Sequence, residues 1–172
     1  MKRIIPITIV IILLTACRHT PSRDQAIADI VACEQQLAQV SVATDEETAR
    51  QMTDLYCQFA TLFPDDSLAP VYLSRAADIS LNLGDNQQAI AILDSIIELY
   101  PGYEDIAGCL FLKGQAYENS EQYDLARQTY TQFVTEYPDH VLAPDTRIML
   151  PYIGLPIEEM FNALIGDNTD KQ

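Results

Sequence analysis

The chain has 172 residues, of which 48% are apolar, and its 25 acidic side chains outnumber its 10 basic ones. A chain of this length is expected to fold as one domain with a core of its own, without a disulfide scaffold. The formal net charge of −15 excludes a cationic track along phosphate groups, so no nucleic acid is expected among the partners.

Residues 1–16 are predicted to be a removable signal peptide. Lys2 and Arg3 give a short cationic start, and the run from residue 4 to residue 13 is almost entirely apolar. This run is too short to cross the ~30 Å hydrocarbon core as a permanent helix. Its removal would leave 8 basic and 25 acidic side chains, a net charge of −17.

Residues 14–17, Leu-Thr-Ala-Cys, resemble the lipobox of bacterial lipoproteins. The resemblance implies that the Cys17 thiol receives a diacylglycerol thioether and that its amine is acylated after cleavage. Two or three acyl chains anchor a protein durably, and the polar residues 17–23 would form a short flexible tether. We expect this covalent lipid and no cofactor. The alternative is an ordinary signal peptide whose cleavage site lies near a cysteine by chance.

Lipoprotein sorting rules give an expected location. The residue after Cys17 is not Asp, which by resemblance favours the outer membrane over the inner one. The acidic run that follows the cysteine in many surface-exported lipoproteins is also missing. We therefore expect a lipid-anchored protein of the bacterial outer membrane that faces the periplasm.

The body of the chain repeats with a period of 37 residues. An aromatic residue precedes Pro64, Pro101 and Pro138, which are evenly spaced by this interval. Two further pairs keep the same interval, Ala89 with Ala126 and Asn82 with Asn119. A fixed period of this length is typical of solenoid and other repeat proteins.

Between these markers the apolar residues have helical spacing. The stripe from Leu73 to Leu83 stops at Gly84, and the stripe from residue 89 to residue 100 stops at Pro101. The next period repeats this hairpin over residues 110–137. Earlier helices are expected near residues 24–42 and 45–62, the second with a capping box at residues 44–47. Small residues are expected where paired helices approach closely: Ala77, Ala89, Gly114 and Ala126.

Two copies of one motif carry a family resemblance. The later copy reads Leu110-x2-Lys113-Gly114-x2-Tyr117, then Ala126-x3-Tyr130-x2-Phe133-x4-Pro138. The earlier copy reads Leu73-x2-Ala76-Ala77-x2-Ser80, then Ala89-x3-Leu93-x2-Ile96-x4-Pro101. This spacing resembles the tetratricopeptide repeat family, although the usual Trp is missing and Ser80 stands in place of an aromatic residue.

The resemblance implies an all-α fold, a right-handed α-solenoid of antiparallel helical hairpins with about three repeats. The repeat domain is expected over residues 24–165, with residues 24–63 as a degenerate first copy. A helix with Pro144 in its first turn should end or kink at Pro151. A capping helix from Pro156 to Leu164 and a disordered tail over residues 166–172 should complete the chain.

The 37-residue period and the Tyr-Pro-Asp-x3-Ala-Pro join narrow the resemblance further. They are similar to the repeats of outer-membrane-assembly lipoproteins and of the periplasmic Tol-Pal coordinator protein. This similarity implies a periplasmic adaptor and brings no catalytic residues with it.

Few residues indicate catalysis or metal binding. His140 has no second ligand at a suitable spacing and is expected to be a solvated loop residue. Cys33, Cys57 and Cys109 are interpreted as buried thiols, although a Cys33–Cys57 disulfide remains open. Paired carboxylates lie in predicted loops or first helical turns, where the helix dipole favours them. We expect no catalytic residues, no metal site and no enzymatic activity.

The remaining candidate site is a peptide-binding groove. By resemblance, the first helix of each hairpin lines the concave face of the solenoid. The corresponding residues are Ser74, Asp78, Asn82, Phe111, Gln115 and Asn119. Asn82 and Asn119 could hydrogen-bond an extended peptide, or they could simply be polar helix ends. The lysines of carboxylate-clamp members of the family are absent, so a basic or neutral partner segment fits better than an acidic one.

These features predict a lipid-anchored scaffold or adaptor that binds proteins in a bacterial cell-envelope complex. One alternative is an accessory lipoprotein for polysaccharide or peptidoglycan handling. Another is a structural oligomer built through the solenoid ends.

Overall fold

The computed structural model describes residues 20–39, 46–156, 158–159 and 162. Several predicted features lie outside these residues: the signal peptide, Cys17, the first half of the capping box, most of the capping helix and the tail. The described part of the chain forms seven α-helices and no strand. The helices are α1 (Arg23–Gln39), α2 (Glu46–Leu62), α3 (Leu68–Asn82), α4 (Asn86–Leu99), α5 (Ile106–Asn119), α6 (Tyr123–Glu136) and α7 (Ala143–Met149).

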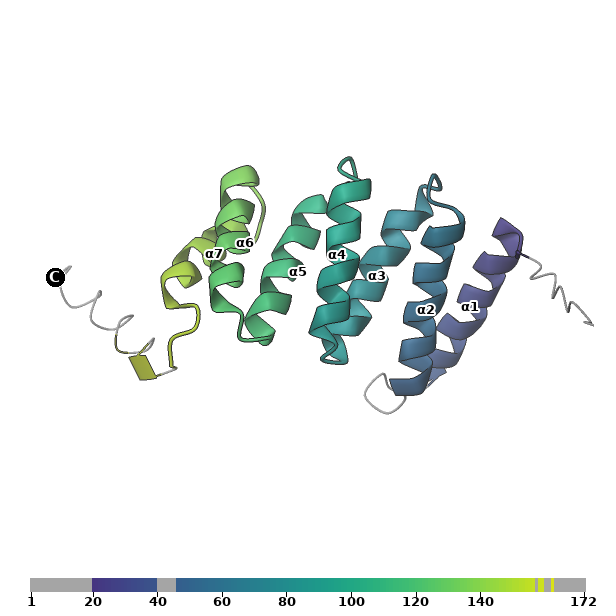
Figure 1. Ribbon diagram of the computed structural model, residues 1–172, viewed down its shortest axis with the longest axis horizontal. Coiled ribbons are helices and arrows are strands. Elements are labelled where there is room, and N and C mark those ends of the chain that lie inside the picture. Colours follow the sequence, from purple (N-terminus) through teal and green to yellow (C-terminus); the bar gives the residue numbers. More distant parts are fainter. Residues whose placement is uncertain (1–19, 40–45, 157, 160–161, 163–172) are drawn as a thin grey trace, which may run out of the picture.

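The helices follow one another in a row from α1 at one end to α7 at the other (Figure 1). Each helix packs on its neighbour in sequence, from α1 on α2 to α6 on α7. Three hairpins result, α1–α2, α3–α4 and α5–α6, and α7 begins a further half-repeat. The predicted all-α solenoid is confirmed.

Proline and glycine end the helices where the sequence predicts. Helix α4 ends just before Pro101 and α6 just before Pro138. Gly84 follows α3 with a positive φ of 76°, in a turn where the Asp85 N–H donates to the Ser80 carbonyl at 2.8 Å. Helix α7 stops at Met149, and Pro151 lies in the short 3-10 helix Leu150–Tyr152 that follows.

Helix α1 begins at Arg23, the last residue of the predicted tether. The Ser22 hydroxyl accepts a hydrogen bond from the Gln25 N–H at 3.2 Å, as an N-cap residue does. The Arg23 side chain is paired with Asp66 in the turn between α2 and α3. This contact fixes the start of α1 beside that turn.

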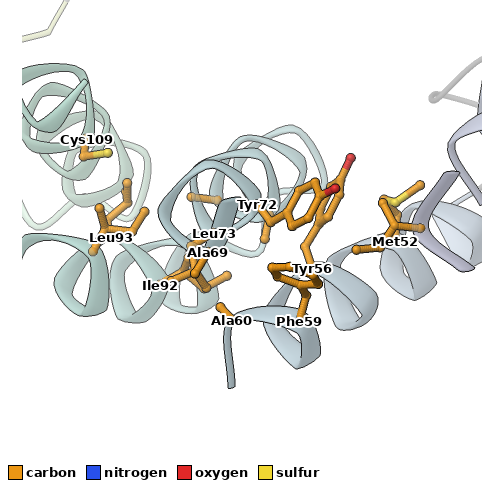
Figure 2. Close-up of a cluster of buried hydrophobic side chains, with 14 of the residues drawn as sticks. Met52, Tyr56, Phe59, Ala60, Ala69, Tyr72, Leu73, Ile92, Leu93 and Cys109 are labelled. Carbon is orange, nitrogen blue, oxygen red and sulfur yellow. The ribbon is translucent and has the colours of Figure 1, made fainter. Parts of the chain in front are cut away.

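A cluster of aromatic rings forms the centre of the main core. The Tyr56 and Tyr72 rings stack with centroids 5.1 Å apart, and Phe59 meets Tyr72 edge-on at 4.8 Å. Figure 2 shows these three rings between α2 and α3, with Met52 on one side and Leu73 on the other. Aromatic burial of this kind dominates core stability, and here it joins the α1–α2 hairpin to α3.

The α5–α6 hairpin has its own core around Phe133, which is fully buried. His140 packs edge-on against the Phe133 ring at 5.2 Å, and its Nδ1 accepts a hydrogen bond from the Leu142 N–H at 3.2 Å. His140 lies in a loop as predicted, but it is half-buried and not fully solvated, because the join after α6 folds back onto this core.

Candidate functional site

The six predicted groove residues fall into two groups. Four are exposed: Asp78 and Asn82 on α3, and Gln115 and Asn119 on α5. The two others are largely withdrawn from solvent because neighbouring elements cover them. They are Ser74, which is only 9% exposed, and Phe111, which is half-buried.

Ser74 faces the neighbouring repeat. Its hydroxyl interacts with the Tyr103 hydroxyl and the Cys109 thiol. The Phe111 ring lies 5.4 Å from the Tyr130 ring and 5.5 Å from the Phe133 ring. Both side chains therefore hold adjacent elements together, and the open part of the predicted groove consists of the four exposed residues.

Asp78 is the charged member of this group. Partial burial raises the pKa of its carboxyl, and the nearby charge of Asp105, just before α5, raises it further. The two carboxylates bring negative charge to the space between α3 and α5. A positively charged side chain placed there would relieve their repulsion.

Asn82 and Asn119 are the last residues of α3 and α5. Both side chains are exposed, and both sit one residue before the C-caps Leu83 and Ser120. This position suits both a peptide-binding amide and a polar helix end.

The basic side chains have a role that the sequence did not indicate. Within the described residues, all six basic side chains contact groups of this same chain. The contacts are Arg23–Asp66, Arg50–Asp85, Arg75–Glu34 at 2.8 Å, Lys113–Asp94 at 2.5 Å, Arg127–Asp124 at 2.6 Å, and Arg147 with the Val134 and Pro138 carbonyls at 3.1 and 3.2 Å. The first four link different helices or the turns between them.

This pairing leaves the surface of the protein with a net negative charge. Every cation of the described chain is engaged, whereas exposed carboxylates such as Asp65, Glu98, Glu104 and Asp139 take part in none of these pairs. Exposed ion pairs add little stability each. Their main effect here is to leave an outer surface that presents uncompensated negative charge.

Two adjoining hollows lie on a different part of the surface. One, of about 680 Å³, lies where the α2–α3 and α4–α5 joins meet and is lined by Pro64, Val71, Leu99 and Tyr100 among others. The other, of about 390 Å³, lies between α2 and α4 and shares Pro64, Leu99 and Tyr100 with the first. We call the two together the join cleft. None of the six predicted groove residues lines it.

The described cysteines do not have the properties of reactive, nucleophilic residues. The structure places no disulfide between Cys33 and Cys57, and Cys57 and Cys109 are present as thiols. Burial raises the pKa of Cys57 to about 11 and that of Cys109 to about 12, each with a smaller contribution from a nearby Asp. A nucleophilic cysteine needs a lowered pKa, so these two residues have the character of core thiols.

Two further findings concern metals and membranes. Across the part of the chain that the structure describes, no three His, Cys, Asp or Glu side chains gather as a metal site would require. None of the helices in those described ranges has both the length and the apolar character needed to cross a membrane.

Comparison with known proteins agrees with the geometry of the two central hairpins. Residues 73–103 and 109–140 match the family model of the tetratricopeptide repeat. These segments cover most of hairpins α3–α4 and α5–α6. No curated protein matches the chain, so its similarity to particular envelope lipoproteins stays a prediction. Two segments of the chain thus match the tetratricopeptide repeat, and they coincide with its two central hairpins.

Proposed function

We propose that this protein is a non-catalytic adaptor that binds a protein partner in a bacterial cell-envelope complex. The observation that carries the proposal is the pair of tetratricopeptide repeats in one continuous row of packed helices. Such solenoids expose extended surfaces to their partners, since each repeat is covered only by its neighbours. The two repeats support protein binding in general, and the envelope setting is our inference from the N-terminal sequence.

The partner segment is basic or neutral. The chain has a net charge of −15, and all six described basic side chains are engaged with groups of the chain itself. An acidic partner would meet repulsion over most of the surface. Charge complementarity mainly sets association rate and specificity, so binding should weaken as salt rises.

The anchor is a lipid on Cys17. Only residues 18–22 separate Cys17 from the start of α1, and an extended chain of this length spans about 20 Å at most. Arg23 is paired with Asp66, so the tether would leave the solenoid beside the α2–α3 join. A lipid on Cys17 would hold that edge close to the bilayer and raise the effective concentration of the protein for membrane partners.

Affinity purification of the full chain from cross-linked native envelopes tests this proposal. The comparison includes an Asn82→Ala/Asn119→Ala variant and a matched Gln87→Ala/Gln128→Ala control on the second helices. We expect one discrete protein to be recovered with wild type and with the control variant. If that protein binds the exposed faces of α3 and α5, the asparagine variant should not recover it. Recovery with all three would keep the adaptor and reject that face.

Recovery of no protein partner by any form would contradict the adaptor proposal. The anchor is tested separately by metabolic labelling with an alkyne fatty acid. Label should appear in wild type and be absent from Cys17→Ser, and unlabelled wild type would contradict the lipid.

A further inference from the structure

We propose that the join cleft is a binding site for a short extended peptide segment that carries a bulky apolar side chain next to a Lys or Arg. The inference rests on the proposed adaptor function and assigns it a site outside the predicted concave groove. It follows from the shape, lining and charge of the cleft.

The size of the cleft limits what it can hold. Its larger part measures about 680 Å³, within the ~300–1,000 Å³ typical of sites for small ligands. This volume accommodates a few side chains and no folded domain. The two parts share Pro64, Leu99 and Tyr100, so a chain lying across this ridge would reach both hollows.

The lining is apolar and projects outward. Leu99 is 64% exposed although it is a large apolar residue at the end of α4. It stands between the hollow formed with Val71 and Pro64 and the hollow formed with Ile92 and Ala60. An apolar partner side chain inserted beside Leu99 would remove both from water, at roughly 25 cal/mol per Å² buried.

The rim is negative. Asp65 and Glu104 line the larger hollow and are exposed. Asp66 also lines it but is already paired with Arg23. The negative charge of Asp65 also acts on Tyr100 in the same hollow. Burial, and to a smaller extent the Asp65 charge, raise the pKa of the Tyr100 hydroxyl. No Lys or Arg lines either hollow, so a partner cation would meet unneutralised carboxylates.

The repeat supplies a matched control. Glu136 and Asp139 lie 37 residues after Leu99 and Gly102, at the next join of the solenoid and outside the cleft. Both are exposed, as Asp65 and Glu104 are. The variants Asp65→Lys/Glu104→Lys and Glu136→Lys/Asp139→Lys therefore change the net charge equally, but only the first pair lies at the cleft.

The experiment selects peptides from a random 12-residue phage library on the full chain purified in detergent. Fluorescence anisotropy of the best labelled peptide then measures binding. We expect selected peptides to place a bulky apolar residue beside Lys or Arg. Asp65→Lys/Glu104→Lys and Leu99→Ser should each weaken binding about tenfold, and Glu136→Lys/Asp139→Lys less than about twofold. Circular dichroism should show unchanged folding, since every altered residue is exposed.

Four results would overturn the inference. Equal loss in both charge variants would show a general electrostatic effect. Loss only in Asn82→Ala/Asn119→Ala would move the site to the concave face. Failure to select any peptide, with the envelope partner still captured, would reject the cleft and keep the adaptor. The protein could also bind phosphatidylethanolamine–phosphatidylglycerol vesicles and no peptide. If Leu99→Ser abolished that vesicle binding, the cleft would be a membrane contact and the peptide site would be overturned.

Discussion

The Tyr130 ring on α6 packs directly on the backbone of Gly114 on α5. A β-carbon at residue 114 would lie 2.6 Å from Cε1 of that ring. Both residues are buried, and the Tyr130 hydroxyl donates to a Glu118 carboxylate oxygen at 3.2 Å. The ring is thus held from two sides and cannot easily yield. This contact explains why the small residue of the repeat motif is required at this position.

We predict that Gly114→Ala lowers the free energy of unfolding by about 1–3 kcal/mol, as overpacking of a buried helix contact does. The gain in helix propensity from Gly to Ala offsets only part of this cost. Denaturant titration followed by circular dichroism measures the effect. Gly102→Ala is the control, because nothing lies within 4 Å of a β-carbon there. Equal stability of the two variants would contradict the close approach.

A second prediction concerns the turn inside each repeat. Glu121 has a φ of 58° and occupies the place that Gly84, with a φ of 76°, has 37 residues earlier. Both turns contain the same hydrogen bond, from Asp85 N–H to the Ser80 carbonyl and from Gln122 N–H to the Tyr117 carbonyl. A side chain strains this left-handed backbone by roughly 1 kcal/mol or more.

Glu121→Gly should therefore raise the free energy of unfolding by about 0.5–1 kcal/mol, and Gly84→Ala should lower it by a similar amount. Thermal unfolding of the three proteins at one pH checks both signs together. Destabilisation by Glu121→Gly would show that the turn does not strain the chain.

The third prediction uses the raised pKa of Asp78. The pKa of the Asp78 carboxyl is raised in the folded protein. Between the ordinary Asp pKa of about 3.9 and the raised pKa, the folded state therefore binds more protons than the unfolded state. The stability contribution of Asp78 therefore falls as pH rises through that window and stays low above it.

Asp78→Asn should increase the free energy of unfolding at pH 7 by about 0.5 kcal/mol, a small effect because water screens this exposed side chain. The difference from wild type should vanish below about pH 3.5. Asp139→Asn, in the exposed join after α6, is the control for the loss of one charge. A difference that persists at low pH would contradict an electrostatic cause.

The fourth prediction concerns thiol reactivity. With a pKa of about 11, Cys57 is present as thiolate at only about one part in a thousand at pH 8. Its alkylation by iodoacetamide should be roughly a hundredfold slower than that of an ordinary thiol and should rise about tenfold per pH unit up to that pKa. Cys109, fully buried, should react more slowly still. Peptide mapping after timed alkylation measures both rates, and rapid labelling of either at pH 8 in the native protein would contradict the assignment.

Much of the fold could be predicted because its signals are local. Pro101 and Pro138 cannot continue a helix, and Gly84 permits the turn after α3. The apolar spacing between them selects a helical hairpin. Two copies in phase then imply stacking, because one hairpin cannot bury its apolar face alone.

The site was predicted less well because it depends on contacts between repeats. Ser74 and Phe111 occupy groove positions in the motif, yet residues of α5 and α6 cover them. Ion pairs such as Arg75–Glu34 join residues 41 positions apart and follow no local spacing. The join cleft likewise forms only where two joins come together in space, so no local sequence pattern predicts it.

The most direct test of the adaptor proposal is site-specific photo-crosslinking in living cells, with p-benzoylphenylalanine placed in turn at Asn82, Leu99, Asn119 and Gln128. We expect an adduct of discrete mass with one other protein, formed at Asn82 and Asn119 or at Leu99 and not at Gln128 on α6. The same envelope protein should be identified at each productive position. Adducts with no protein at any position, or only with second copies of this chain, would contradict the adaptor function.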